Sequence, residues 1–267
     1  MTPENTDRYI EFREPRTIVE LEEMLKLRYA VRRSCHLAAL CPENEAQIDI
    51  DEFDRYAYHV GLFALENHRF VPVGYSRFVL DHPGPQARWV ELIARRNKLT
   101  EKISEPAVLF PCLKYVPTEY ADKVTSLHQR ATSEGKTMGE SSGTVLHPDI
   151  RSLKTASRWV EAIVGYCMIW KQISYGTMTV SDHHAPFYFR FGFKPLEGTT
   201  AFRASFSAGV ALCLEHLPQD EPRTAGVFRS AHEFAATGKV VICGNRTPKV
   251  TLHHSPLQER TQLCAHA

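Results

Sequence analysis

Residues 140–180 read ESSGTVLHPDIRSLKTASRWVEAIVGYCMIWKQISYGTMTV. The central part, 155–173, carries large apolar side chains at helical spacing and is the clearest helix pattern in the chain. The segments that flank it, 140–147 and 175–180, are predicted to be strands. Parallel neighbours in a sheet need a crossover connection, commonly a helix, so this stretch predicts a parallel strand pair with its crossover helix.

Around this unit the chain alternates helix and strand patterns. The order is an amphipathic helix, an antiparallel hairpin turning at Asn67 and His68, a long insert, the crossover unit, a short helix and a last strand. Apart from the crossover unit, the ranges in this order are 17–40, 57–66 with 71–80, 81–138, 183–191 and 204–215. The pattern predicts an α+β domain over 1–218, with a mixed central sheet flanked by helices. For the C-terminal extension, 219–267, disorder and packing outside the domain both stay open, with one short strand at KVVIC.

The bulk composition limits the classes of function. The 267 residues carry a formal net charge of +1, so any anionic partner must meet a local basic patch, and no nucleic-acid binding is expected. The polar N-terminus is unlike a signal peptide, and no apolar run reaches the roughly 18 residues of a membrane helix. The seven cysteines include no CxxC and the thirteen histidines no HExxH. We therefore expect reduced thiols, a cytoplasmic location and no metal site.

The junction between strand and helix near Pro148 has the features of an anion site. Free backbone N–H groups and the dipole at a helix start attract phosphate. Arg151 and Lys154 add positive charge there. A basic helix start without a ligand is the equally simple alternative.

Charged residues recur at three separate places in the N-terminal half. Arg28 lies on the first predicted helix, Asp51 and Asp54 lie in an acidic loop, and Arg77 lies on the second hairpin strand. Arginines facing carboxylates at the mouth of a cleft can fix loop geometry and hold a substrate that has both an amine and a carboxylate. A solvated acidic loop is the alternative.

The junction resembles motif A of the GNAT superfamily of acyltransferases. In that family a strand leads to an R/Q-x-x-G-x-G/A turn, whose amides hold the pyrophosphate or phosphopantetheine of the acyl carrier. The matching positions here are Val145, Arg151, Lys154, Thr155 and Ala156, with Lys154 in place of the first glycine. A lysine there suits the single phosphate of a carrier protein's phosphopantetheine better than the pyrophosphate of CoA.

Residues 188–193, YFRFGF, are similar to the Y-x-x-x-G-F signature of the same superfamily. The resemblance implies that Tyr188 protonates, or hydrogen-bonds to, the departing thiolate. A phenol with a pKa of about 10 can do this for a thiol leaving group of similar basicity. The alternative is that Tyr188 only packs among the neighbouring phenylalanines.

The N-terminal charged series resembles that of acyl-homoserine-lactone synthases and the related N-acyl amino acid synthases. Their R-Y, E-x-D-x-x-D and G-x-x-R elements, near the acceptor site, are matched at Arg28, Asp51, Asp54 and Arg77. Their E-x-x-R begins here at Glu140, a candidate base for the amine, but ends at Gly143. The missing arginine favours the N-acyl amino acid synthases, or a related bacterial acyltransferase of protein-sorting gene clusters.

The resemblance therefore implies an enzyme that moves a long acyl group from an acyl carrier protein thioester to the amine of an amino acid or related molecule. A backbone N–H near Val145 would stabilise the oxyanion, and Val108, Leu109, Phe110 and Leu113 would help to line the acyl tunnel. No cofactor is implied besides acyl-carrier-protein or CoA thioester as co-substrate. The basic residues that would receive the carrier protein are Arg95, Arg96, Lys98, Arg151, Lys154 and Arg158. The alternatives are a CoA-dependent N-acetyltransferase for a small amine or protein, and a non-catalytic binding module.

Overall fold

The computed structural model describes residues 8–35, 37–197, 202–203, 208–215, 217 and 224–244. Its strands are β1 (Ile10–Arg13), β2 (Ala57–Glu66), β3 (Arg69–Val79), β4 (Met138–Leu146), β5 (Tyr175–Ser181), β6 (Lys194–Pro195), β7 (Phe202–Arg203), β8 (Ala208–Leu214) and β9 (Val240–Cys243). Its α-helices are α1 (Ile18–Arg33), α2 (Ala87–Arg96), α3 (Thr118–Ser133), α4 (Leu153–Val164), α5 (Ala185–Phe189) and α6 (Ala225–Thr237).

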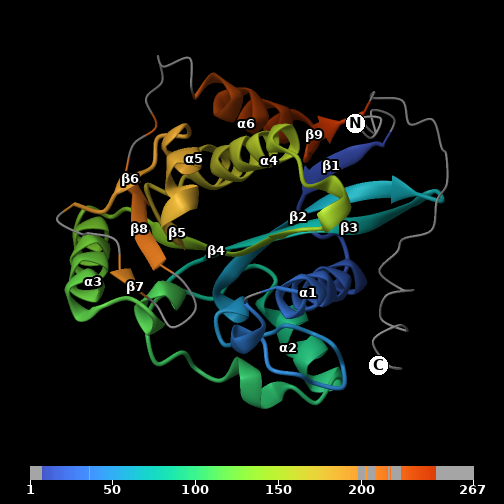
Figure 1. Cartoon of the computed structure of the whole chain (residues 1–267), viewed down its shortest axis with the longest axis horizontal. Helices are drawn as coiled ribbons and strands as arrows, with labels where there is room; N and C mark the ends of the chain where they lie inside the picture. Colours follow the sequence, from blue (N-terminus) through green and yellow to red (C-terminus); the bar gives the residue numbers. More distant parts are fainter. Residues whose placement is uncertain are drawn as a thin grey trace.

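The strands form one sheet with the order β6-β8-β5-β4-β3-β2-β1-β9, and β7 pairs with β8 (Figure 1). Among the described strand pairs only β4 and β5 are parallel, and α4 connects them. The predicted α+β class, the mixed sheet and the parallel pair with its crossover helix are therefore confirmed. The insert between β3 and β4 carries α2 and α3.

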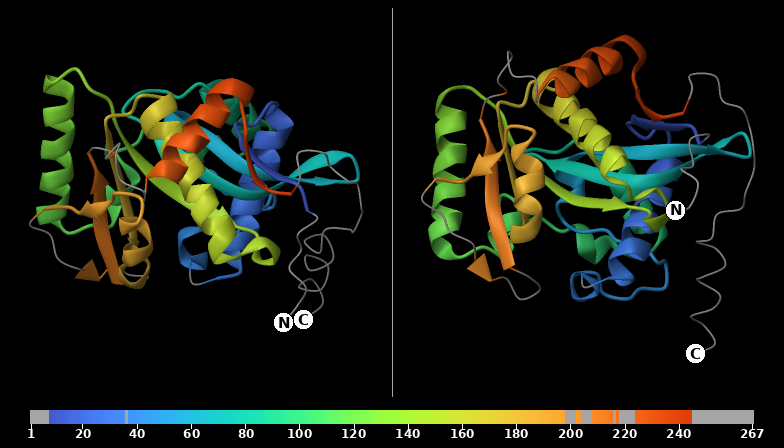
Figure 2. Two further views of the ribbon diagram at one scale, coloured as in Figure 1. Left: turned by 90° about the horizontal axis from the view of Figure 1, so that it is seen from above. Right: turned by 45° about the horizontal axis from the view of Figure 1, so that its top comes forward.

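Helices cover both faces of the sheet, as Figures 1 and 2 show. On one face α4 and α6 contribute Trp159 and Phe234 to a core that contains Leu62. On the other face α1 and α2 pack around Phe63, the next residue of β2. Successive side chains of a strand point to opposite faces, which is why neighbouring apolar residues of β2 supply two different cores.

The hairpin is confirmed, with β2 and β3 paired antiparallel from Ala57 to Glu66. Its turn residues, Asn67 and His68, have φ values of 50° and 62°. Two central residues with positive φ match the right-handed twist of the adjoining strands, and asparagine tolerates that conformation better than most residues. The local sequence therefore sets the hairpin register.

Two helix boundaries differ from the prediction. The first helix ends at Arg33 and not near residue 40, because the Ser34 N–H bonds to the Ala30 carbonyl but the next N–H, of Cys35, bonds to the Arg32 carbonyl in a tighter turn. The crossover helix begins at Leu153 and passes into a π-helical turn from Gly165 to Trp170.

Part of the predicted C-terminal extension packs on the domain. The predicted short strand is present as β9, which pairs with β1 at the edge of the sheet. Residues 225–237 form α6, whose buried Val227, Ala231 and Phe234 recur at helical spacing. The residues 219–223 and 245–267 lie outside the described part of the chain. The described helices include none that is long and apolar enough to cross a membrane.

Candidate active site

Strands β4 and β5 separate after a short stretch of parallel pairing. They pair only over Met138–Glu140 on β4 and Tyr175–Thr177 on β5. Beyond these residues β4 stays with β3 as far as Leu146, and β5 stays with β8 as far as Ser181. Their facing edges therefore diverge into a V-shaped gap, and backbone groups on these edges lack a partner on the opposite strand.

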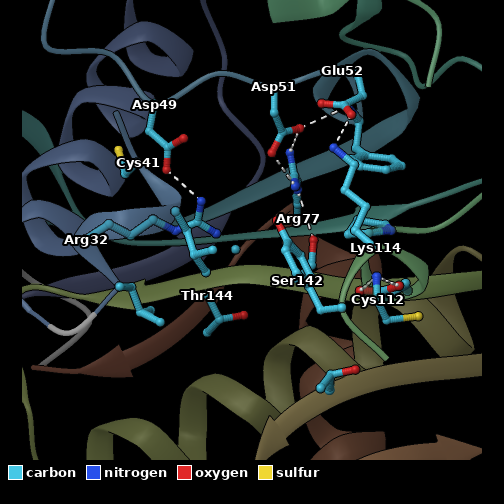
Figure 3. A pocket seen from close by; sticks show the side chains of 18 of the residues that line it. Arg32, Cys41, Asp49, Asp51, Glu52, Arg77, Cys112, Lys114, Ser142 and Thr144 are labelled. Atoms are coloured by element: carbon cyan, nitrogen blue, oxygen red, sulfur yellow. Dashed lines mark hydrogen bonds and ion pairs between the residues drawn. The ribbon is translucent and has the colours of Figure 1, made fainter. Parts of the chain in front are cut away.

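A cavity of about 730 Å³ opens on the α1 side of this gap (Figure 3). The loop after α1, the insert, β4, β5 and α5 all contribute to its walls. A smaller space of about 20 Å³ lies on the α4 side. Both spaces touch Ser141, Thr144, Met178 and Tyr188, so they meet at the gap. The larger volume falls in the range of small-molecule sites, roughly 300–1,000 Å³.

Glu140 lies where the two strands part, and only 2% of its surface is exposed. The backbone N–H of Cys112, from the insert, donates to both carboxylate oxygens at 3.1 and 2.9 Å. Burial raises the pKa of Glu140 to about 7, although the hydrogen bonds from Cys112 and the charge of Arg77 offset part of that rise. A carboxylate that titrates near neutral pH is suited to take a proton from an amine.

Tyr188 projects from α5 and lines both the cavity and the smaller space. Its ring makes edge contacts with Phe187 and Phe193, with centroids 5.3 and 6.1 Å apart. Burial raises the pKa of its phenol, so the hydroxyl keeps its proton at neutral pH. The tyrosine therefore belongs to an aromatic cluster and also faces the gap.

The charged residues of the N-terminal half meet in one network. Arg28 makes two hydrogen bonds to Asp54, at 2.9 and 2.7 Å. Arg77 makes two to Asp51, at 2.6 and 2.8 Å, and one to Asp54 at 2.7 Å. Burial alone would raise the pKa of Asp54, but Arg28 and Arg77 hold it well below its usual range. Burial also acts to raise the pKa of Asp51, but the charge and hydrogen bonds of Arg77, together with the charge of Arg28, lower it below its usual value.

All four residues were predicted to lie at the acceptor site, but only two of them reach the cavity. Arg28 and Asp54 have no exposed surface and do not line the cavity. Arg77 and Asp51 do line it. We therefore assign Arg28 and Asp54 to the support of the cavity wall, because neither side chain reaches the cavity in which a ligand would bind.

Gly143, at the position of the family's arginine, lies in a β-bulge of β4. Residues 143 and 144 both stand opposite Ser76 of β3, and the register shifts there. Gly143 has a φ of +68°, and the side chains of Tyr75 and Arg28 lie directly over it. A long side chain would need both a left-handed backbone and the space that Arg28 occupies.

We expect Gly143→Ala to lower the free energy of unfolding by about 1–2 kcal/mol, since a left-handed backbone costs an L-residue about that much. The added Cβ would also lie 3.3 Å from Tyr75 and 3.5 Å from Arg28. Urea unfolding measures the loss. Gly135→Ala is the control, because Gly135 has a similar φ of +64° and nothing within 4 Å. A smaller loss at Gly143 than at Gly135 would contradict this packing.

The strand–helix junction differs in detail from the predicted phosphate cradle. Ser152 caps α4, and its hydroxyl accepts the Thr155 N–H at 3.0 Å, while the Ala156 N–H bonds to the Ser152 carbonyl at 2.9 Å. The amides of Thr155 and Ala156 are therefore already engaged. Among the first helical residues, Leu153 and Lys154 keep N–H groups without an intrahelical partner.

The remaining junction residues lie outside both cavities. Arg151 and Lys154 are exposed, and the Arg151 Nε donates to the Leu146 carbonyl at 3.1 Å. Val145 points into the core beneath α1. Its backbone belongs to the splayed part of β4, beyond the last pair with β5.

Two expectations about surfaces are corrected. Phe110 is fully buried, and Val108, Leu109 and Leu113 pack with it against α3. The insert lines the cavity through other residues instead, namely Leu99, Glu101, Lys102, Ser104, Pro111, Cys112, Lys114 and Tyr115. The basic residues do not form one patch. Those of α2 and those of α4 lie on opposite sides of the sheet (Figure 1).

Sequence reasoning missed two residues of the cavity wall. Arg32 lies one helical turn after Arg28, a spacing that places both on one side of α1 and could have revealed it. Cys112 holds Glu140 through its backbone, which leaves no trace in the sequence. The described residues contain no cluster of histidine, cysteine and acidic side chains able to hold a metal ion.

Comparison with known proteins gives distant structural similarity. No family model and no curated protein matches the chain. The chain is similar to FeeM, an N-acyl amino acid synthase from uncultured soil microbes, with 15% identity and a TM-score of 0.47 over 79% of this chain and 92% of that one. It is similar to the AHL synthase LasI, with 16% identity and a TM-score of 0.48 over 82% and 94%. It is also similar to the CoA-dependent acyl-homoserine lactone synthase BjaI, with 15% identity and a TM-score of 0.47 over 92% of each chain.

Proposed function

We propose that the protein is an N-acyltransferase that moves an acyl group from a thioester to the amine of a small molecule in the 730 Å³ cavity. The position of Glu140 carries the proposal. It is a buried carboxylate with a pKa of about 7, and it lies where the gap between β4 and β5 meets the cavity. An amine on the α1 side and a thioester in the gap would meet beside it.

The reaction divides between two side chains. Glu140 takes a proton from the ammonium group of the acceptor, and the free amine attacks the thioester carbonyl carbon. The C–N bond forms, the C–S bond breaks, and the Tyr188 phenol supplies a proton to the departing thiolate. The second proton of the attacking nitrogen returns to the tyrosinate, so Glu140 holds the one proton that the reaction releases. Backbone N–H groups on the splayed edge of β4 can stabilise the oxyanion of the intermediate. Amide formation from a thioester needs no metal or redox cofactor, because the thiol is already a good leaving group.

The donor is best matched by an acyl-phosphopantetheine on a carrier protein. The free amides of Leu153 and Lys154, with the exposed Lys154 ammonium, can hold one phosphate at the start of α4. The unpaired strand edges of the gap can hydrogen-bond the amides of the pantetheine arm. This supports a carrier protein thioester, with CoA as the alternative donor.

A panel assay tests the proposal. Purified protein is incubated with long-chain acyl carrier protein, long-chain acyl-CoA or acetyl-CoA, together with a mixture of amino acids and simple amines. Mass spectrometry of the extract identifies any N-acyl amine. We expect N-acyl amino acids from the long-chain carrier thioester. Turnover with acetyl-CoA alone would favour an acetyltransferase, and no turnover with any donor would favour a binding module.

Tyr188→Phe is expected to lower kcat about 10- to 100-fold while it leaves KM for the amine nearly unchanged, because the hydroxyl acts on the leaving thiolate and not on the acceptor. Steady-state kinetics with a thiol-detecting reagent measure both constants. Tyr175→Phe is the control, since the Tyr175 hydroxyl bonds Glu134 away from the cavity. Full activity of Tyr188→Phe would remove the residue from the mechanism.

A further inference from the structure

We infer that Arg32 binds the carboxylate of an amino-acid acceptor, an assignment that rests on the proposed N-acyl transfer. Arg32 and Arg28 lie one turn apart on α1, but only Arg32 lines the cavity. In Figure 3 its guanidinium lies between Asp49 and Thr144, two other residues that line the cavity. About 15% of its side chain is exposed, so it is held in place and still reachable by a ligand.

Open N–H donors distinguish Arg32 from Arg77 and Lys114 on the cavity wall. Lys102, a further cation that lines the cavity, is exposed. The Arg32 guanidinium has five N–H donors, and it makes one hydrogen bond, from Nη1 to the Asp49 carboxylate at 2.8 Å, with no second acceptor among the described residues. Arg77 already makes two bonds to Asp51, and Lys114 is paired with Glu52. A planar guanidinium with open donors is the group best suited to a carboxylate.

The ion pairs behind the wall form a chain with two different ends. Asp49 contacts both Arg32 and Arg28, at 2.8 and 3.0 Å. Arg28 then contacts Asp54, which contacts Arg77, and Arg77 contacts Asp51. Positive and negative charges alternate, so the chain as a whole is neutral. Its two ends at the cavity are the cation Arg32 and the anion Asp51.

This polarity complements a zwitterion. An acceptor with its carboxylate at Arg32 would direct its ammonium group towards Asp51, which lies near enough to Glu140 to affect its pKa. The amine would then lie beside the base at the gap. A diamine, or an amine without a carboxylate, would leave the donors of Arg32 unused.

The test compares three acceptors on the full-length protein: the amino acid preferred in the panel assay, its carboxamide, and the amine that lacks the carboxyl group. KM and kcat are measured for wild type, Arg32→Gln and Arg32→Lys. Arg33→Gln is the matched control, because Arg33 is the next residue of α1, pairs with Glu43 and does not line the cavity. Thermal unfolding checks that each variant is folded.

We expect Arg32→Gln to raise KM for the amino acid about 10- to 100-fold, with KM for the carboxamide and kcat for both changed less than about threefold. Arg32→Lys should recover part of the affinity, and Arg33→Gln should resemble wild type. An equal rise in KM for the acid and the carboxamide, or no preference of wild type for the acid, would overturn the assignment.

Calorimetric titration of the amino acid and its carboxamide tests the contact without turnover. We expect the amino acid to bind wild type more tightly than it binds Arg32→Gln, and the carboxamide to bind both alike. If wild type acylates no amine, the proposed reaction fails, and the titration still decides whether Arg32 binds a carboxylate. Equal affinities of wild type and Arg32→Gln for the amino acid would reject this role.

Discussion

Glu140→Gln is expected to lower kcat for amine acylation about 10²- to 10⁴-fold at pH 7, the range in which a positioned general base contributes. Glutamine has nearly the same shape, and its amide oxygen can still accept the Cys112 N–H. It cannot take a proton. Glu52→Gln is the control, because Glu52 lines the same cavity but is paired with Lys114 at its rim. We expect Glu52→Gln to keep activity within about threefold.

The expected pH dependence of kcat/KM follows from the pKa of Glu140, which is about 7. The carboxylate must be deprotonated to act as a base, so kcat/KM of wild type should fall as the pH drops below about 7. Glu140→Gln should lack this limb. A profile of wild type that is flat from pH 5.5 to 8.5 would contradict the role of Glu140 as the base.

Stability gives an independent check on Glu140. Its pKa is raised from 4.5 to about 7 by burial, so the folded protein binds this proton more tightly than the unfolded chain does. The stability of wild type should therefore fall as the pH rises from about 4.5 to about 7, through this group alone. Glutamine carries no such charge. At pH 8 the inactive Glu140→Gln protein should be at least as stable as wild type, which separates loss of chemistry from loss of fold.

Arg28→Ala is expected to lower the free energy of unfolding by about 3–5 kcal/mol, because it removes the two hydrogen bonds of Arg28 to the fully buried Asp54 and leaves the buried ion-pair network with one uncompensated negative charge. Urea unfolding monitored by circular dichroism measures the loss. Arg130→Ala is the control, since Arg130 and its partner Glu215 are both about half exposed, and such surface pairs contribute about 0–1 kcal/mol. A stable Arg28→Ala protein with only a raised KM for the amine would restore Arg28 to substrate binding.

The sequence alone predicts the helices, strands and turns that depend on a local residue pattern. The hairpin follows from a turn that tolerates positive φ at Asn67 and His68, and the crossover unit follows from helical spacing between two short strands. The meeting of Arg28, Asp54 and Arg77 was also predictable. Their depth was not predictable, because the sequence does not show whether a charged side chain lies on the cavity wall or behind it. Tertiary packing of α1 against β3 sets that depth.

Other features depend on contacts that the local sequence does not contain. The apolar residues of the insert could line a tunnel or pack on α3, and only the position of α3 decides between them. The start of α4 depends on one hydroxyl, since Ser152 takes the Thr155 amide that the motif would offer to a phosphate. The raised pKa of Glu140 arises from burial beneath an insert distant in sequence.

The proposed reaction at Glu140 transfers an acyl group from a thioester to an amine. Its most direct measurement is a paired count of both products, free thiol by a colorimetric reagent and N-acyl amide by mass spectrometry, for wild type and Glu140→Gln at pH 8 with a long-chain acyl carrier protein and an amino acid. We predict equal amounts of thiol and amide from wild type, and both products from the variant at a rate lower by about 100-fold or more. Thiol without amide, or equal amounts of both products from the two proteins, would contradict the account.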